Sequence, residues 1–311
     1  MTVSLTPKTF LARLPGTTGV ETMKDTAILL YSVFKLRIGM AIMLCALAGV
    51  AITPGAAPGG WQIALLAVAV LLSSASAGAF NHYVERDLDA RMQRTRRRPF
   101  VTGRFRPGPA WLVSIVLMLL MAVGATAVAV NPFAAAHVFL GAFVYGVVYT
   151  VWLKRRTWLN IVVGGLAGSF AVLAGAAAVD PALGPAPLIL AVVLFLWTPP
   201  HFWSLAFAYR ADYSEAKVPM LPVVVDGALA ARIILAHAVT LVLLSLSLVA
   251  FGMGWIYGIG AAVGGAYFVR GCVRLAREPG TATAMGAFRA SLVQLSLLLI
   301  AVLLDSWLLG S

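Results

Sequence analysis

Nine long apolar stretches dominate this sequence and limit what it can fold into. Each is long enough to cross the roughly 30 Å hydrocarbon core of a bilayer. They cover approximately residues 27–52, 60–84, 109–129, 133–152, 159–178, 185–207, 228–250, 254–274 and 288–309. A membrane-spanning segment must satisfy its own backbone hydrogen bonds, so these stretches predict helices. We therefore expect an all-α, polytopic membrane protein with nine transmembrane helices around a central cavity.

Composition excludes a soluble globular protein. Of the 311 residues, 61% are hydrophobic and only 11% are charged, a balance that soluble domains of this size do not show. We expect a cytoplasmic N-terminal segment over residues 1–26 and a single transmembrane domain over residues 27–311. The two cysteines, Cys45 and Cys272, fall in different spans. Neither a disulfide framework nor a zinc site is indicated, because no CxxC or histidine spacing lies near them.

The net charge of +12 reflects membrane topology and not a nucleic-acid partner. With the N-terminus inside and nine spans, all 23 Lys and Arg residues fall on one side of the membrane or within a turn of it. That asymmetry fits the positive-inside rule. The sequence therefore predicts a multi-pass protein of the inner (plasma) membrane, surrounded by the lipid bilayer, with its N-terminus in the cytoplasm.

Most of the acidic and basic residues that could take part in catalysis lie at the end of the second span. If the helix that enters from Leu65 continues through Asp89, then Asn81, Glu85 and Asp89 share one helical face. An amide and two carboxylates followed by arginines suit Mg²⁺, which prefers a few carboxylates together with substrate phosphates. The alternative is a solvated helix end of mixed charge.

A second polar loop follows the sixth span, on the same predicted side of the membrane. It begins near Asp212 and includes Lys217, so two acidic loops are expected to converge on one polyanion. The sixth span ends in residues 197–203, where two prolines should break or kink the helix. Broken helices in membranes usually line a protein cavity. In the last spans, His237 and Asp305 are expected to pack or to make local hydrogen bonds.

Several of these motifs together resemble a known family. The segments that carry the resemblance are Lys35-Leu36-Arg37, Asn81-x-x-x-Glu85-x-x-x-Asp89, Met92-Gln93-Arg94-Thr95, Leu153-Lys154-Arg155-x-Thr157-x-x-Asn160, Trp197-x-Pro199-Pro200-His201-Phe202-Trp203 and Asp212-Tyr213-x-x-Ala216-x-Val218-Pro219-Met220-Leu221-Pro222. This order is similar to the protohaem IX farnesyltransferase (haem O synthase) branch of the UbiA-type intramembrane prenyltransferases. The matching motifs run from about residue 35 to residue 225.

The resemblance implies transfer of the farnesyl group of farnesyl diphosphate to a vinyl group of haem b, giving haem O and diphosphate. It implies Mg²⁺ as cofactor, and catalytic, metal-binding residues Asn81, Glu85, Asp89 and Asp212. The substrates would be bound by Lys35, Arg37, Arg94, Tyr149, Lys154, Asn160, His201 and Lys217. Glu85 stands where the family pattern has Asp. Haem A synthase or terminal oxidase assembly factors are the protein partners that the resemblance suggests.

Alternatives stay open at this stage. A UbiA-type prenyltransferase with an aromatic, quinone-precursor acceptor would share the diphosphate site but not the Pro-Pro-His-Phe-Trp segment. A transporter would show ionisable groups near the middle of the membrane, whereas the acids here cluster at one surface. His201 has two interpretations. It either contacts the acceptor or is a hydrogen-bonded histidine at the membrane interface.

Overall fold

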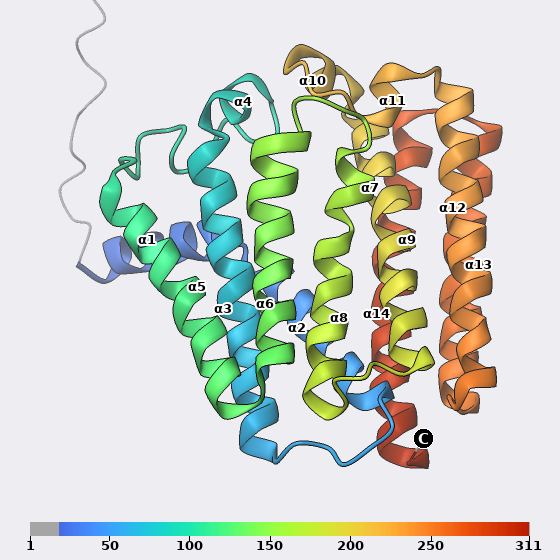
Figure 1. The fold of residues 1–311 in the computed structure, drawn as a ribbon. Coiled ribbons are helices and arrows are strands. Elements are labelled where there is room, and N and C mark those ends of the chain that lie inside the picture. Colours follow the sequence, from blue (N-terminus) through green and yellow to red (C-terminus); the bar gives the residue numbers. More distant parts are fainter. Residues whose placement is uncertain (1–18, 311) are drawn as a thin grey trace, which may run out of the picture.

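The computed structural model describes residues 19–310, which form helices that run side by side (Figure 1). No strand occurs among these residues. The elements in chain order are α1 (Gly19–Val33), α2 (Leu36–Ile52), α3 (Gly60–Val84), α4 (Arg86–Arg91), α5 (Pro109–Ala129), α6 (Pro132–Phe143), the π-helix η1 (Val144–Leu153), α7 (Asn160–Gly164), α8 (Leu166–Val179), α9 (Pro185–Ala208), α10 (Arg210–Glu215), α11 (Leu221–Val224), α12 (Gly227–Ser247), the 3₁₀ helix η2 (Leu248–Phe251), α13 (Trp255–Arg277) and α14 (Thr281–Leu309). The predicted all-α class is confirmed.

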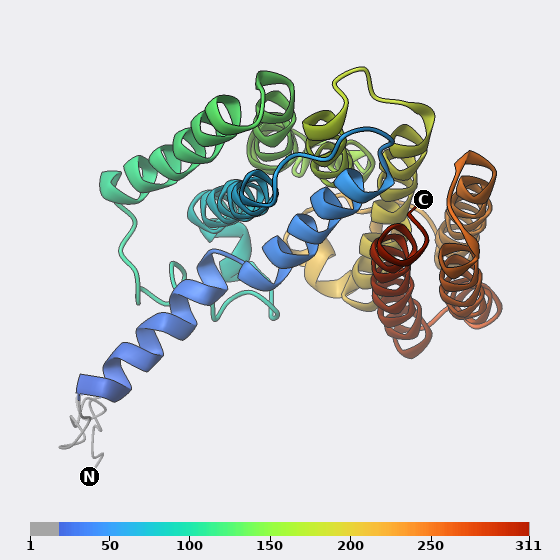
Figure 2. The same cartoon turned by 90° about the horizontal axis from the view of Figure 1, so that it is seen from below.

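The number of membrane spans agrees with the prediction, with one correction at the first span. Between residues 19 and 310, eight helices are long and apolar enough to cross a bilayer. The segments Met23–Val33 and Leu36–Ile52 add a ninth if they count as one span, but they meet at an angle of 49°. The helix predicted over residues 27–52 is therefore interrupted at Phe34 and Lys35. Figure 2 shows α1 extending away from the other helices.

Prolines and capping residues fix where several helices begin. α5, α6 and α9 all start at a proline, whose fixed backbone angle suits the first helical position and whose missing N–H is not needed there. The side chain of Asn131 caps α6 by accepting a hydrogen bond from the Ala134 amide at 2.8 Å. Asp305 accepts hydrogen bonds from the Gly254 and Tyr257 amides at 2.6 and 2.9 Å. Asp305 is therefore hydrogen-bonded, but its partners lie 51 and 48 residues away in the chain and not nearby as expected.

Helices α2 and α8 approach each other closely at two glycines. A Cβ atom added to Gly49 would lie 2.0 Å from the Val172 carbonyl oxygen, and one added to Gly175 would lie 1.8 Å from the Ala46 carbonyl oxygen. Each glycine thus admits the backbone of the opposite helix, as small residues do in membrane helix pairs. This contact holds α2 against the middle of the bundle.

The short helices α4, α10 and α11 lie at one end of the long helices (Figure 1). The helix that precedes α4 covers the predicted second span but does not continue through Asp89. α3 stops at Val84, and Glu85 is the residue between α3 and α4. Even so, the Glu85 amide donates to the Asn81 carbonyl at 3.0 Å and the Asp89 amide donates to the Glu85 carbonyl at 2.8 Å. Asn81, Glu85 and Asp89 therefore remain one helical turn apart from each other, although the helix is interrupted at Glu85.

α9 has the predicted length but is continuous through its two internal prolines. It continues from Pro185 to Ala208 through Pro199 and Pro200, so the helix is not broken at these prolines. The hydroxyl of Ser204 donates to the Pro200 carbonyl at 2.6 Å. The aromatic residues that follow the prolines are therefore presented from a helix and not from a loop.

Candidate active site

A polar cavity of about 420 Å³ lies where the ends of α3, η1 and α9 approach the segments that contain α4 and α10. Six of the predicted site residues line it: Lys35, Asn81, Glu85, Arg94, Tyr149 and Lys154. They come from four separate stretches of the chain. The expectation that polar groups distant in sequence meet at one end of the bundle therefore holds for these six.

Lys35 enters the cavity from the break between α1 and α2. Its backbone has φ 48° and ψ 40°, a left-handed conformation that costs energy for a residue with a side chain. Its ammonium group donates to Asn81 Oδ1 at 2.6 Å and to the Tyr145 hydroxyl at 2.7 Å. The break in the first span thus places a cation inside the cavity, where an unbroken helix was predicted.

Asn81 and Glu85 connect α3 to η1 and the loop after it. The Asn81 amide donates to the Thr150 hydroxyl at 3.1 Å. The Lys154 ammonium group donates to both Glu85 carboxylate oxygens, at 2.6 and 2.5 Å. The Glu85 side chain is 1% exposed and that of Lys154 is 12% exposed. This is a buried ion pair, which is strongly destabilising to break on one side only.

Asp89 forms a second buried pair. Its two carboxylate oxygens accept hydrogen bonds from one guanidinium nitrogen of Arg98, at 2.9 and 2.7 Å. Arg98 lines the cavity, whereas Asp89 lies behind it and is buried. Both carboxylates of the first acidic motif therefore already have cationic partners that belong to the chain.

A third pair nearby faces solvent. Arg155 donates to the two carboxylate oxygens of Asp87 at 2.6 and 2.7 Å, and both side chains are at least 42% exposed. The hydrogen bonds from the Arg155 guanidinium lower the pKa of Asp87 below its ordinary value. This pair joins the same two segments as Glu85 and Lys154, but outside the cavity.

The second acidic loop meets the first. The Asp212 carboxylate accepts a hydrogen bond from the Arg94 amide at 3.2 Å, and Asp212 is 8% exposed. Its neighbour Tyr213 lines the cavity, whereas Asp212 does not. The predicted convergence of the two loops is thus seen directly in this contact.

The π-helix η1 places two tyrosines in one column. The rings of Tyr145 and Tyr149 are stacked, with centroids 5.7 Å apart and planes at 10°. The ammonium groups of Lys35 and Lys154 lie 5.4 and 5.6 Å from the centroids of Tyr145 and Tyr149, within range of cation–π attraction. The tyrosines therefore form one aromatic wall of a cavity that charged side chains also line.

The oxygen atoms at this site suit Mg²⁺ only if a bound phosphate group supplies further ligands to the ion. In the part of the chain that the structure describes, no three His, Cys, Asp or Glu side chains gather closely enough to hold a metal ion. Asn81, Glu85, Asp89 and Asp212 nevertheless offer hard oxygen atoms near one cavity. Because Mg²⁺ is usually held by one or two carboxylates and by substrate phosphates, these residues fit an ion that arrives with a phosphate group.

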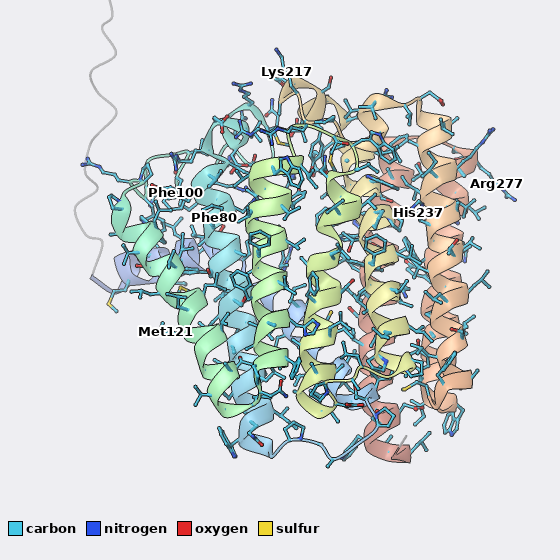
Figure 3. The ribbon with its side chains drawn as sticks, viewed as in Figure 1. Phe80, Phe100, Met121, Lys217, His237 and Arg277 are labelled. Carbon is cyan, nitrogen blue, oxygen red and sulfur yellow. The ribbon has the colours of Figure 1, made fainter. Side chains whose placement is uncertain are left out.

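Four other predicted residues lie apart from the cavity lining. Arg37 is exposed on α2, and Asn160 is buried at the start of α7, where its amide donates to the Thr157 carbonyl at 2.6 Å. Lys217 is exposed and points away from the helices (Figure 3). A direct role of these three in substrate binding stays a prediction.

His201 is the fourth of these residues. Its ring is stacked between Trp197 and Phe288, at centroid distances of 4.2 and 4.6 Å. Its Nδ1 atom lies 2.7 Å from the Ser291 hydroxyl. The buried ring is thus engaged with α14, which matches the hydrogen-bonded alternative, while contact with an acceptor stays a prediction.

The cavity lining also contains residues that the sequence does not single out as site residues, among them His82, Arg98 and Tyr145. Arg98 is one of several arginines after α4, and nothing in the sequence distinguishes it from Arg96 or Arg97. Tyr145 shares the Lys35 ammonium group with Asn81. The sequence does not show this, because an α-helix in place of the π-helix would turn Tyr145 to a different side.

Comparison with known proteins agrees with this geometry. Residues 42–305 match the model of the UbiA prenyltransferase family. A protein of Paramagnetospirillum magneticum named protoheme IX farnesyltransferase 2 is 57% identical over 281 residues, which cover 90% of this chain and 98% of that protein. Protoheme IX farnesyltransferase 1 of the same organism is 47% identical, covering 87% and 95%.

Solved structures share the fold at low sequence identity. The structure of a digeranylgeranylglyceryl phosphate synthase matches with a TM-score of 0.72 and 16% identity, over 91% of this chain and 99% of that one. A UbiA homologue from Archaeoglobus fulgidus bound to DMAPP and Mg²⁺ matches with a TM-score of 0.64 and 14% identity, over 86% and 98%. These two likenesses concern the arrangement of the helices.

Proposed function

We infer that this chain, which belongs to the UbiA prenyltransferase family, transfers the farnesyl group of farnesyl diphosphate to a vinyl group of haem b and releases diphosphate. Haem O is the product. The observation that carries the proposal is the cavity in which Lys35, Arg98 and Lys154 share the walls with hard oxygen donors and stacked tyrosines. The names of the relatives with 57% and 47% identity support the same reaction.

The cationic side chains would act on the leaving group. When the bond between farnesyl C1 and the diphosphate oxygen breaks, its electron pair stays on the diphosphate. Lys35, Lys154 and Arg98 line the cavity in which this charge would develop, and cations already present at the site stabilise such charge. Their present partners, Asn81, Glu85 and Asp89, hold the three cations in position before the substrate arrives.

Magnesium fits the same site. Asn81, Glu85, Asp89 and Asp212 would hold it together with diphosphate oxygens, and bound Mg²⁺ supplies further neutralisation of the leaving charge. The Mg²⁺ and DMAPP bound to the Archaeoglobus fulgidus homologue support this proposal. For the ion to reach Glu85 and Asp89, Lys154 and Arg98 must move from these carboxylates toward the phosphates.

The aromatic wall would serve the farnesyl group and its acceptor. The faces of Tyr145 and Tyr149 can stabilise the positive charge on the allylic carbon through cation–π attraction. The π electrons of the haem vinyl group then form the new carbon–carbon bond. Water adds to the resulting cation and loses a proton, which gives the hydroxyethylfarnesyl side chain. The surrounding apolar helices limit the access of water before this step.

One assay tests the proposal. Purified protein is supplied with labelled farnesyl diphosphate and either haem b or 4-hydroxybenzoate. Labelled haem O and free diphosphate are expected with haem b only. Transfer to 4-hydroxybenzoate would instead indicate an aromatic acceptor, and an absence of transfer to either would contradict the prenyltransferase function.

The cellular setting forms part of the proposal. We place the chain in the inner (plasma) membrane as one transmembrane domain, residues 27–311, with the segment of residues 1–26 in the cytoplasm. Residues 1–18 and 311 lie outside the part that the structure describes. Association with haem A synthase or terminal oxidase assembly factors stays a prediction, which co-purification from mild detergent would test.

A further inference from the structure

One histidine of the chain differs from the other three. All four histidines lie among the described residues. The Nδ1 atoms of His137 and His237 lie 2.9 and 3.0 Å from the carbonyl oxygens of Phe133 and Ile233, one turn earlier in their own helices. His201 Nδ1 contacts a serine hydroxyl, as described above. The Nδ1 atom of His82 is buried and has no partner in the described structure.

His82 lies inside the candidate active site. It is 3% exposed, sits in the last turn of α3 and lines the polar cavity. A buried polar atom without a partner is costly, because it has given up its hydrogen bonds with water. The adjacent side chain of Asn81 does not meet this need, since its oxygen accepts from Lys35 and its amide donates to Thr150.

The charges around His82 indicate the kind of ligand that would complete it. Lys35, Arg98 and Lys154 line the same cavity, and Glu85, one turn beyond His82, carries the nearest carboxylate on its own segment. Both oxygens of that carboxylate already accept hydrogen bonds from Lys154. An anion held among the three cations would present further acceptor oxygens to the imidazole. A neutral imidazole has one N–H donor, whose position on the ring depends on the tautomer.

We propose that His82 is a further diphosphate-binding residue, whose ring N–H donates a hydrogen bond to an oxygen of the diphosphate bound among Lys35, Lys154 and Arg98. The inference rests on the proposed function and deepens it. It also assigns the two buried histidines of the region to different tasks. His82 binds the leaving group, while His201 belongs to the contact between α9 and α14.

The test measures binding of inorganic diphosphate in the presence of Mg²⁺, by titration calorimetry on the purified full chain. His82→Leu removes the donor at nearly constant volume. His82→Asn keeps an amide nitrogen close to the position of Nδ1. We expect His82→Leu to weaken diphosphate binding about tenfold to a hundredfold, as for the loss of a hydrogen bond to a charged group. His82→Asn should recover most of this loss.

A second measurement separates binding from a structural role. Without ligand, His82→Leu should unfold at the same temperature as the wild type or at a higher one, because it removes an unsatisfied buried polar atom. The matched control is His137→Leu, which lies in α6 away from the cavity lining. It should leave diphosphate binding unchanged.

Three outcomes would overturn the proposal. Diphosphate binding by His82→Leu at wild-type strength would remove His82 from the site. A lower unfolding temperature of His82→Leu without ligand, with no rescue of binding by Asn, would make the residue structural. An altered haem absorption spectrum with unchanged diphosphate binding would place it on the acceptor side. If the wild type itself binds no diphosphate, the proposed function fails first, and the role of His82 fails with it.

Discussion

The ammonium nitrogen of Lys154 lies 2.6 and 2.5 Å from the two carboxylate oxygens of Glu85, although 69 residues separate them in the chain. One residue further along, Arg155 makes the same kind of pair with Asp87, between the same two segments but in solvent. The two pairs differ chiefly in burial. The exposed pair therefore serves as a control when the contribution of the buried pair to stability and to substrate binding is measured.

Lys154→Met should destabilise the protein by about 3 kcal/mol, because it leaves the buried Glu85 carboxylate without its partner. Arg155→Met should cost less than about 1 kcal/mol, since exposed ion pairs contribute little. Chemical or thermal unfolding in detergent measures both. Only Lys154→Met should also lose diphosphate binding. Equal effects of the two substitutions would contradict the assignment of Lys154 to the cavity.

Metal and diphosphate should bind together. Glu85 and Asp89 are already paired with Lys154 and Arg98, so a divalent ion alone must displace two cations, whereas diphosphate offers these cations new partners. Equilibrium dialysis with Mn²⁺ in place of Mg²⁺ should show weak metal binding to the protein alone and much stronger binding with inorganic diphosphate. Asp89→Asn should weaken the joint binding. Equally tight metal binding with and without diphosphate would show that the ion pairs do not block the site.

The polar loops at the α4 and α10 end should all face the cytoplasm, because the basic residues gather there. In a variant without Cys45 and Cys272, single cysteines at Arg104, Glu215 and Glu278 should resist a membrane-impermeant maleimide added outside sealed cells. Each of these positions is exposed in the structure. A cysteine at Ala57, in the loop at the other end, should react. Labelling of Arg104→Cys from outside would reverse the proposed orientation.

Gly175→Ala should disrupt the contact between α2 and α8. The added Cβ would lie 1.8 Å from the Ala46 carbonyl oxygen, so the helices must separate, at a cost of about 1–3 kcal/mol as in overpacked cores. Gly168→Ala, in the same helix, meets nothing within 4 Å and should be neutral or slightly stabilising, since alanine favours helix. Unfolding temperatures in detergent compare the two. A neutral Gly175→Ala would mean that the helices are not held at this distance.

Much of the fold could be predicted because the bilayer leaves few choices. Apolar stretches of sufficient length must be helices in a membrane, and the prolines at 109, 132 and 185 mark where three of them begin. The place of Lys154 near the diphosphate site, where it meets Glu85 from 69 residues away, was implied by the family resemblance. The meeting of Asp212 with the segment after α4 followed from the predicted topology, which puts both acidic loops on one side of the membrane. Sequence periodicity and charge asymmetry thus determine which groups share one end of the bundle.

The details of the site depend on features that hydropathy does not encode. The break at Lys35 interrupts a stretch whose apolar character continues on both sides. The burial of Asp89 against Arg98 is a second such feature, because nothing in the sequence distinguishes this arginine from its neighbours. Replacement of Asp89 by Ala would leave a buried guanidinium unpaired and would affect folding as well as binding. Contacts between side chains of distant segments decide such points, and no local pattern reports them.

The π-helix η1 makes the site sensitive to the number of residues in this segment. Its carbonyls bond to amides five residues ahead, as in the 2.9 Å contact from the Lys154 amide to the Tyr149 carbonyl, so each turn holds more residues than an α-helical turn. Removing a single residue between Tyr145 and Lys154 would allow an ordinary α-helix to form. The lysine and the tyrosines would then rotate to different faces, although every one of them would still be present. In this segment the number of residues, and not their identity alone, belongs to the active site.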